Sequence, residues 1–179
     1  DDDIGSHLLG YVYRIVVYYT TIQAAINACV AGDNTITLLG ASAEDVTIKQ
    51  TEGVNIVLDG ANNTYSGTIT IHGNARYDGA ETLTIKNFKF TTDEAGHYFI
   101  DSNSTAATER YAHNVTVKNC TFTATGDAID SAAAMRIRQG FNIAIENVTA
   151  TDVHSLFQGY GVSGVTMSDV TVNGKNGIS

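Results

Sequence analysis

Apolar and polar residues alternate in short runs along most of this chain, a pattern typical of half-buried β-strands rather than helices. Four runs share one template: apolar, polar, apolar, polar, Asn or Asp, apolar, polar, apolar. They cover residues 83–90, 115–122, 143–150 and 165–172. Two earlier runs, at 36–41 and 56–61, begin the same template with Gly in its fifth place. The template therefore predicts a series of stacked strands.

Each template contains a bend. Inward positions lie two residues apart until a step of three separates Ile85 from Phe88, and Val117 from Cys120. A straight strand would turn every later side chain to the opposite face, so the chain must bend at the extra residue. The residues there tolerate the left-handed backbone region, and we expect the Asn side chains to point inward and to bond neighbouring backbone. The predicted bend ladder is Gly40, Gly60, Asn87, Asn119, Asn147 and Asp169.

A second series of alternating runs lies between the bends, at 46–50, 69–73, 98–102, 135–139 and 155–159. Two strands in a repeat of about 20 residues, with insertions, suit one coil of a solenoid. The sequence predicts an all-β fold, a right-handed parallel β-helix of about six coils. The last coil stops part-way, as expected of a fragment or of an end that another chain covers.

One amphipathic helix is expected before the first strand. Thr20 and Gln23 have capping-box spacing, and Ile22, Ile26 and Cys29 share one helical face. Such a helix can cover the N-terminal end of the core and shield its open edge. The expected organisation is a tag or linker remnant at 1–10, an N-terminal cap with the helix at 11–34, and the parallel β-helix at 35–179, its last coil incomplete.

The composition of the chain excludes several classes of protein and of binding partner. The chain has 179 residues, 43% of them hydrophobic, enough for one domain with a continuous core. No apolar run is long enough to span a membrane. A net charge of −9 argues against nucleic acid as a partner and, more weakly, against a strongly anionic glycan. Phosphate-loop, zinc-ligand and nucleophile motifs are missing from the sequence, so no cofactor and no metal site are predicted.

Outward residues of the second series are expected to stack as one polar column, at about 4.8 Å per strand. Asp101 would lie between His72 and Arg138 and pair with Arg138, while Arg136 and Tyr160 flank the column. It is either a glycan-binding groove or a solvated sheet face with favourable cross-strand pairs. The predicted ligand-facing residues are Lys49, His72, Asp101, Arg138, Gln158 and Tyr160.

The helix at 21–27, the following Gly-Asp-Asn-Thr-Ile-Thr-Leu-Leu at 32–39, and the Ile-Lys-Asn and Ile-Glu-Asn steps resemble the pectate-lyase-like right-handed parallel β-helix superfamily. The resemblance covers residues 20–179. It implies a fold shared by polysaccharide lyases, glycoside hydrolases and non-catalytic adhesin domains of bacterial surface proteins. Arg-Ile-Arg at 136–138 is similar to one motif of polygalacturonase-like hydrolases, but their Asn-Thr-Asp, Asp-Asp and Gly-His-Gly motifs are missing. No catalytic residue is therefore assigned.

We expect a non-catalytic module of a secreted or cell-surface bacterial protein, serving adhesion, display or contact with a glycan or host surface. One alternative is a fragment of a polysaccharide lyase or glycoside hydrolase that acts through the polar column. Another is a purely structural spacer. The unfinished last coil also fits end-to-end self-association, although a truncated chain explains it equally well.

Overall fold

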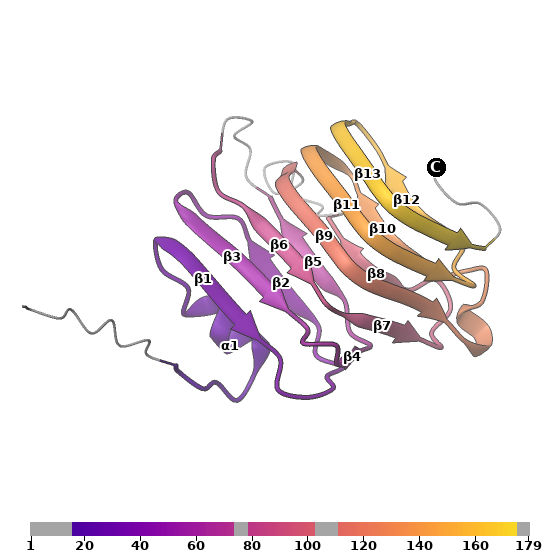
Figure 1. Ribbon diagram of the computed structural model, residues 1–179, viewed down its shortest axis with the longest axis horizontal. Coiled ribbons are helices and arrows are strands. Elements are labelled where there is room, and N and C mark those ends of the chain that lie inside the picture. Colours follow the sequence, from indigo (N-terminus) through magenta and orange to yellow (C-terminus); the bar gives the residue numbers. More distant parts are fainter. Residues whose placement is uncertain (1–15, 74–78, 103–110, 175–179) are drawn as a thin grey trace, which may run out of the picture.

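The computed structural model describes residues 16–73, 79–102 and 111–174. These residues form an all-β protein with one short α-helix, α1 (Ile22–Asn27), and a single-turn 3-10 helix, Gly126–Ala128. The strands form two parallel sheets, one of eight strands and one of five. In each sheet the strands follow one another along the length of the molecule (Figure 1). The prediction of an all-β chain is confirmed.

The eight-stranded sheet contains the runs that carry the bend template. Its strands are β1 (Gly32–Thr37), β3 (Val54–Asp59), β4 (Thr64–Tyr65), β6 (Leu83–Lys86), β7 (Lys89–Thr92), β9 (Tyr111–Ala124), β11 (Gln139–Thr151) and β13 (Val162–Asn173). The order along the sheet is β1-β3-β6-β9-β11-β13, and β4 joins it through β7, which pairs with β9. From β9 onward the template is one continuous bent strand.

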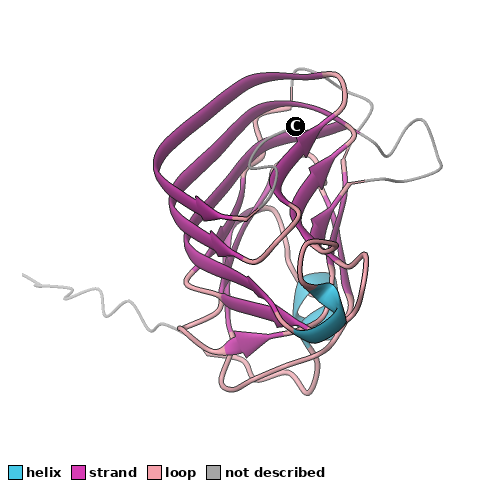
Figure 2. Cartoon of the chain, turned by 90° about the vertical axis from the view of Figure 1, so that its right-hand side faces the viewer, coloured by secondary structure: helices cyan, strands magenta, loops and turns pink. Residues whose placement is uncertain are grey.

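The five-stranded sheet contains the second series of runs. Its strands are β2 (Val46–Lys49), β5 (Ile69–His72), β8 (Tyr98–Asp101), β10 (Ala133–Ile137) and β12 (Ser155–Gly159). They follow one another in chain order, and each pairs in parallel with the next. Along the chain, strands of this sheet alternate with strands of the larger one. The two sheets form opposite walls around the core, seen from the end that carries β12 and β13 (Figure 2).

Aromatic rings fill the middle of the core. The ring centroid of Phe90 lies 5.0 Å from that of Phe88 and 4.6 Å from that of Phe122, both in stacked geometry. Tyr65 and Phe99 approach the same ring at 5.7 and 5.6 Å. Aromatic pairs at these separations stabilise a core beyond the area they bury. Phe90 therefore lies at the centre of this aromatic cluster.

The first strand has a different register from the one that the template predicts. The template pairs Ile36 with Ile56, whereas in the structure Ile36 lies opposite Leu58 and Asn34 lies opposite Ile56. A shift of two residues keeps every side chain on its own face, so alternation alone cannot distinguish the two registers. The amide of Asn34 donates to the carbonyl of Asn55 at 3.1 Å, which favours the observed pairing.

Four of the six predicted bend residues have left-handed backbone conformations. The φ angles are 58° at Asn87, 53° at Asn119, 49° at Asn147 and 52° at Asp169. Asn and Asp adopt this region more readily than other residues that carry a Cβ atom. Three of the four are aligned by the pairing of β6, β9 and β11, and β13 continues the alignment.

For Gly40 and Gly60 the prediction of a left-handed bend is wrong. Neither has a positive φ, and after β3 that conformation occurs at Ala61 and Asn62 instead. Gly60 is required for a different reason, because a Cβ atom there would lie 2.6 Å from the carbonyl oxygen of Asn87. Gly40 has no atom within 4 Å of such a position, and the shifted register of β1 moves it out of line with Gly60.

The ladder amides lie at the surface, which corrects the expectation that they point inward. Asn119 and Asn147 are exposed. The Nδ2 of Asn147 donates to the Oδ1 of Asn119 at 2.9 Å, and that of Asn119 to the Oδ1 of Asn87 at 3.3 Å. The chain of amides ends on Asp59, to which Asn87 donates at 2.9 Å. An amide carries both a donor and an acceptor, so identical residues in successive strands satisfy one another.

Asp59 anchors the ladder as a carboxylate. Burial alone would raise its pKa, but the N–H of Ala61, the amide of Asn87 and the ammonium of Lys86 together lower the pKa below its ordinary value. The Nζ of Lys86 lies 3.2 Å from its Oδ2. The charged form that the ladder requires is thereby favoured.

Two variants of Asn119 separate the two contributions of an Asn at a bend: its tolerance of the left-handed backbone conformation and the ladder hydrogen bonds of its side chain. Asn119→Gly keeps the left-handed backbone accessible and removes the ladder hydrogen bonds, which we expect to cost about 1 kcal/mol of unfolding free energy. Asn119→Ala also places a Cβ atom in that conformation and should cost about 1–2 kcal/mol more. Urea denaturation of both proteins measures the difference. Equal losses of unfolding free energy in the two variants would show that the left-handed conformation at Asn119 imposes no cost on a residue with a Cβ atom.

The helix α1 caps the N-terminal end of the core through polar contacts. Its N-cap is Thr21, whose hydroxyl accepts an N–H of the first turn, rather than the predicted Thr20. The side chain of Gln23 pairs with the backbone of Thr47 on β2, accepting at 2.7 Å and donating at 3.0 Å. The carboxylate of Glu44 accepts two further N–H groups of the helix at 2.8 and 2.9 Å. These bonds hold α1 against the first strands.

Candidate ligand-binding groove

The outer face of the five-stranded sheet carries the predicted polar residues, but in two rows. Asp101 lies opposite Thr70 on β5 and Arg136 on β10, so the prediction that it lies between His72 and Arg138 and pairs with Arg138 is wrong. The shift is again two residues, which alternation does not detect. One row across the sheet consists of Thr47, Thr70, Asp101, Arg136 and Gln158.

The other predicted residues lie two positions further along their strands. Lys49 and His72 are directly opposite each other on β2 and β5. Arg138 and Tyr160 follow the paired ends of β10 and β12, and the N–H of Tyr160 donates to the carbonyl of Ile137 at 3.0 Å. Tyr160 is 57% exposed. These residues are therefore separate from the row that contains Asp101.

Asp101 and Arg136 form a rigid pair at the centre of the first row. The Nε of Arg136 donates to Oδ1 of Asp101 at 2.8 Å, and its Nη2 donates to Oδ2 at 2.6 Å. The guanidinium carbon lies 3.7 Å from the centroid of the Tyr98 ring. Hydrogen bonding to Asp101 raises the pKa of Arg136, which keeps the guanidinium charged. A bidentate, stacked arginine is held in one orientation, unlike a free surface side chain.

A groove with a volume of about 400 Å³ adjoins this pair. Most of the polar side chains that line it come from the segments just before three neighbouring strands, and one comes from the C-terminal end of β8: Asp45, Ser66, Thr68, Glu94 and His97, with Asp101. Asp45 accepts the N–H of Thr68 through Oδ1 at 2.7 Å, and the hydroxyl of Thr68 donates to the carbonyl of Tyr98 at 3.0 Å. These bonds tie the three turns together, so the wall of the groove is preformed.

His97 lies at the groove and is 9% exposed. Its Nδ1 is 3.4 Å from the Oε2 of Glu94, and its ring meets the edge of Phe99 at 4.9 Å between centroids. Its Nε2 has no hydrogen-bond partner among the residues that the structure describes. Within residues 16–73, 79–102 and 111–174, no group of three or more His, Cys, Asp or Glu side chains is arranged to hold a metal ion.

Sequence reasoning missed a second polar cluster, which is buried inside the protein. The Nε2 of His113 lies 3.0 Å from Oε1 of Glu81, and the two side chains are 0% and 2% exposed. The side chain of Gln50 bonds both backbone groups of His113, at 2.6 and 3.0 Å. A Cβ atom on Gly79 would lie 2.6 Å from that Nε2, so this glycine allows the pair to close. Because the cluster is shielded from solvent, we assign it a structural role.

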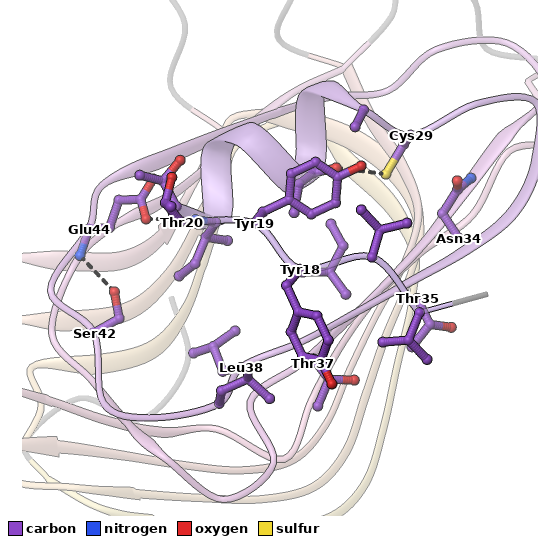
Figure 3. A pocket seen from close by; sticks show the side chains of 18 of the residues that line it. Tyr18, Tyr19, Thr20, Cys29, Asn34, Thr35, Thr37, Leu38, Ser42 and Glu44 are labelled. Atoms are coloured by element: carbon purple, nitrogen blue, oxygen red, sulfur yellow. Dashed lines mark hydrogen bonds between the residues drawn. The ribbon is translucent and has the colours of Figure 1, made fainter. Parts of the chain in front are cut away.

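A larger hollow, of about 680 Å³, lies at the N-terminal end between α1, the segment before it and β1 (Figure 3). Tyr18 and Tyr19 line it together with Leu38 and Cys29. Most of the exposed large apolar side chains of the described residues lie between Val16 and Leu39. The helix therefore covers this end of the protein only in part.

No protein-family model, curated protein sequence or solved structure matches this chain. Its own geometry defines its class: an all-β protein in which two parallel sheets pack against one core and the smaller sheet bears a polar groove. Among the described residues there is no helix with the length and apolar character needed to cross a membrane.

Proposed function

We propose that this chain is a right-handed parallel β-helix module of the pectate-lyase-like kind, from a secreted or cell-surface protein, and that it binds a glycan without cleaving it. The alternation of strands between two parallel sheets supports the solenoid. Crossovers between parallel strands of one sheet are right-handed in about 98% of cases, which supports its hand. The amide ladder of Asn87, Asn119 and Asn147 supports coils stacked in register.

The continuous polar row beside the groove carries the proposal of glycan binding. Its five positions present hydroxyl, carboxylate, guanidinium and amide groups on successive strands. Successive strands are about 4.8 Å apart, so a linear sugar chain lying along the row would meet a new polar group at each strand. Sugar hydroxyls both donate and accept hydrogen bonds, and the row offers both kinds of partner.

Binding without cleavage follows from how the central carboxylate is held. Both oxygens of Asp101 accept hydrogen bonds from Arg136. A glycosidase needs a carboxylic acid that can donate a proton to the leaving oxygen, together with a second carboxylate acting as base or nucleophile. Asp101, fixed on both oxygens by a guanidinium, is suited to accept a further hydrogen bond from a sugar hydroxyl.

The test is glycan-array screening of the full chain, followed by calorimetric titration of the best oligosaccharide. We expect Asp101→Ala and Gln158→Ala to weaken binding, by about tenfold for Asp101→Ala, since a lost hydrogen bond to a charged group is worth about 1.5 kcal/mol or more. The matched control is Glu146→Ala, an exposed acid on the opposite sheet, which should bind like the parent.

Two outcomes would overturn the proposal. One is a folded parent protein that binds no glycan, or that binds equally well after both substitutions in the row. The other is the release of reducing ends from any bound polysaccharide, which would identify an enzyme. Circular dichroism of each variant establishes that lost binding does not reflect lost structure.

A further inference from the structure

The charge of the groove narrows the class of glycan that fits it. Its lining includes the acids Asp45, Glu94 and Asp101, and neither Lys nor Arg contributes to it among the described residues. Asp101 is neutralised by Arg136, which lies beside the groove. Asp45 and Glu94 are exposed and set the local charge. The groove is therefore negative, in a chain whose net charge is −9.

Among the described residues, the charged side chains that line the groove are all carboxylates, which accept hydrogen bonds. One carboxylate, Asp45, is fixed by the N–H of Thr68 at 2.7 Å. The Nδ1 of His97 lies 3.4 Å from the Oε2 of Glu94, so a second carboxylate belongs to the same groove. The Nε2 of the same ring has no hydrogen-bond partner among the described residues, although His97 lines the groove and is nine-tenths buried. A ligand that complements this groove must be rich in donors.

We propose that the groove selects a glycan with free amino groups, a de-N-acetylated hexosamine oligomer. The inference rests on the proposed glycan-binding function and specifies its ligand. An ammonium group offers three donors and no acceptor, which complements the carboxylates of Asp45 and Glu94. An N-acetyl group removes that charge, and a uronate or sulfate would be repelled. The hydroxyls of the same oligomer engage the adjoining row of Thr70, Asp101 and Arg136.

The experiment compares short oligomers of glucosamine, N-acetylglucosamine and galacturonate by calorimetric titration with the full chain, at low and at physiological ionic strength. Spermidine serves as an amine without a sugar. We expect the glucosamine oligomer to bind most tightly, with an affinity that falls as salt rises. Asp45→Asn and Glu94→Gln should each weaken it by about threefold to fivefold, as for a partly exposed ion pair. Glu146→Gln, with the same charge change on the opposite sheet, should leave it unchanged.

The outcomes separate this inference from the function on which it rests. Equal affinity for the N-acetylated oligomer, or indifference to both groove substitutions, would overturn the amine specificity and leave glycan binding intact. Equal binding of spermidine would show that the sugar is not recognised. An equal loss in Glu146→Gln would show that binding follows overall charge and not the groove. If no glycan binds at all, the proposed function itself fails.

Discussion

Phe90→Ala is expected to lower the free energy of unfolding by about 3–5 kcal/mol. Phe90 is 1% exposed, and its ring lies between those of Phe88 and Phe122. Truncation removes the transfer free energy of the ring and leaves a cavity that neighbours on three strands can fill only in part, because the parallel hydrogen-bond ladders hold those strands in place. Urea denaturation followed by circular dichroism measures the loss.

Tyr160→Ala is the control for Phe90→Ala. Its side chain is 57% exposed, so we expect a change within about 0.5 kcal/mol. A loss below about 1 kcal/mol for Phe90→Ala would contradict the packing described here, because no buried Phe in a close-packed core is removed at so small a cost.

The second large effect is expected at the buried pair of Glu81 and His113. Their side chains are 2% and 0% exposed, and the two facing atoms, Oε1 and Nε2, have no hydrogen-bond partner in the described part of the chain. They are close enough for an ion pair, 3.0 Å apart, although not aligned as a hydrogen bond. Removing one partner leaves the facing polar atom of the other buried with no group opposite it. Glu81→Leu and His113→Leu should each cost about 3–5 kcal/mol.

The double variant Glu81→Leu/His113→Leu tests whether the two residues act as a pair. It buries no orphaned polar group, so we expect it to lose less stability than the sum of the two single variants. Unfolding free energies of the four proteins form a double-mutant cycle. If the single losses add without a coupling term, the contact between these side chains contributes nothing to folding.

The bends and the inward faces could be predicted from residue spacing. The step of three predicts that Ile85 and Phe88 both face the core, and both are buried. It holds equally for Val117 and Cys120, which are 1% and 2% exposed. These predictions succeed because the direction of a side chain along an extended strand is a local property of the backbone, repeated every two residues.

The candidate site was predicted less well, because the alternation of side chains does not distinguish strand registers that differ by two residues. The pattern chose Arg138 as the partner of Asp101, and the structure pairs Asp101 with Arg136. Arg136 lies in β10 and Arg138 follows directly after it, two residues further along the same run, so each is compatible with the alternation. The contribution of Asp45 to the groove beside the pair was also missed, because this residue lies in the turn before β2, where no periodicity marks it.

The pair of Glu81 and His113 was missed for a different reason. Taken one at a time, Glu81 before β6 and His113 within β9 are each expected to be solvated, since ionisable side chains are mostly exposed. Only the stacking of β6 beside β9 places the two together, with Gly79 leaving room for them. A contact between residues this far apart in sequence leaves no mark on the local pattern.

The amino-acid sequence by itself determined which residues face inward, where the chain bends and which residue types occupy most of the bends, because each depends on the geometry of a few consecutive residues. The tertiary structure alone decided how far β1 and several strands of the smaller sheet slide along their neighbours, and hence which polar side chains meet at Asp101. A register shift of two residues leaves the same side chains buried and the same side chains exposed, so the hydrophobic effect does not favour one register over the other. The choice is left to specific hydrogen bonds, such as those of Asn34 and Arg136, between segments distant in the chain.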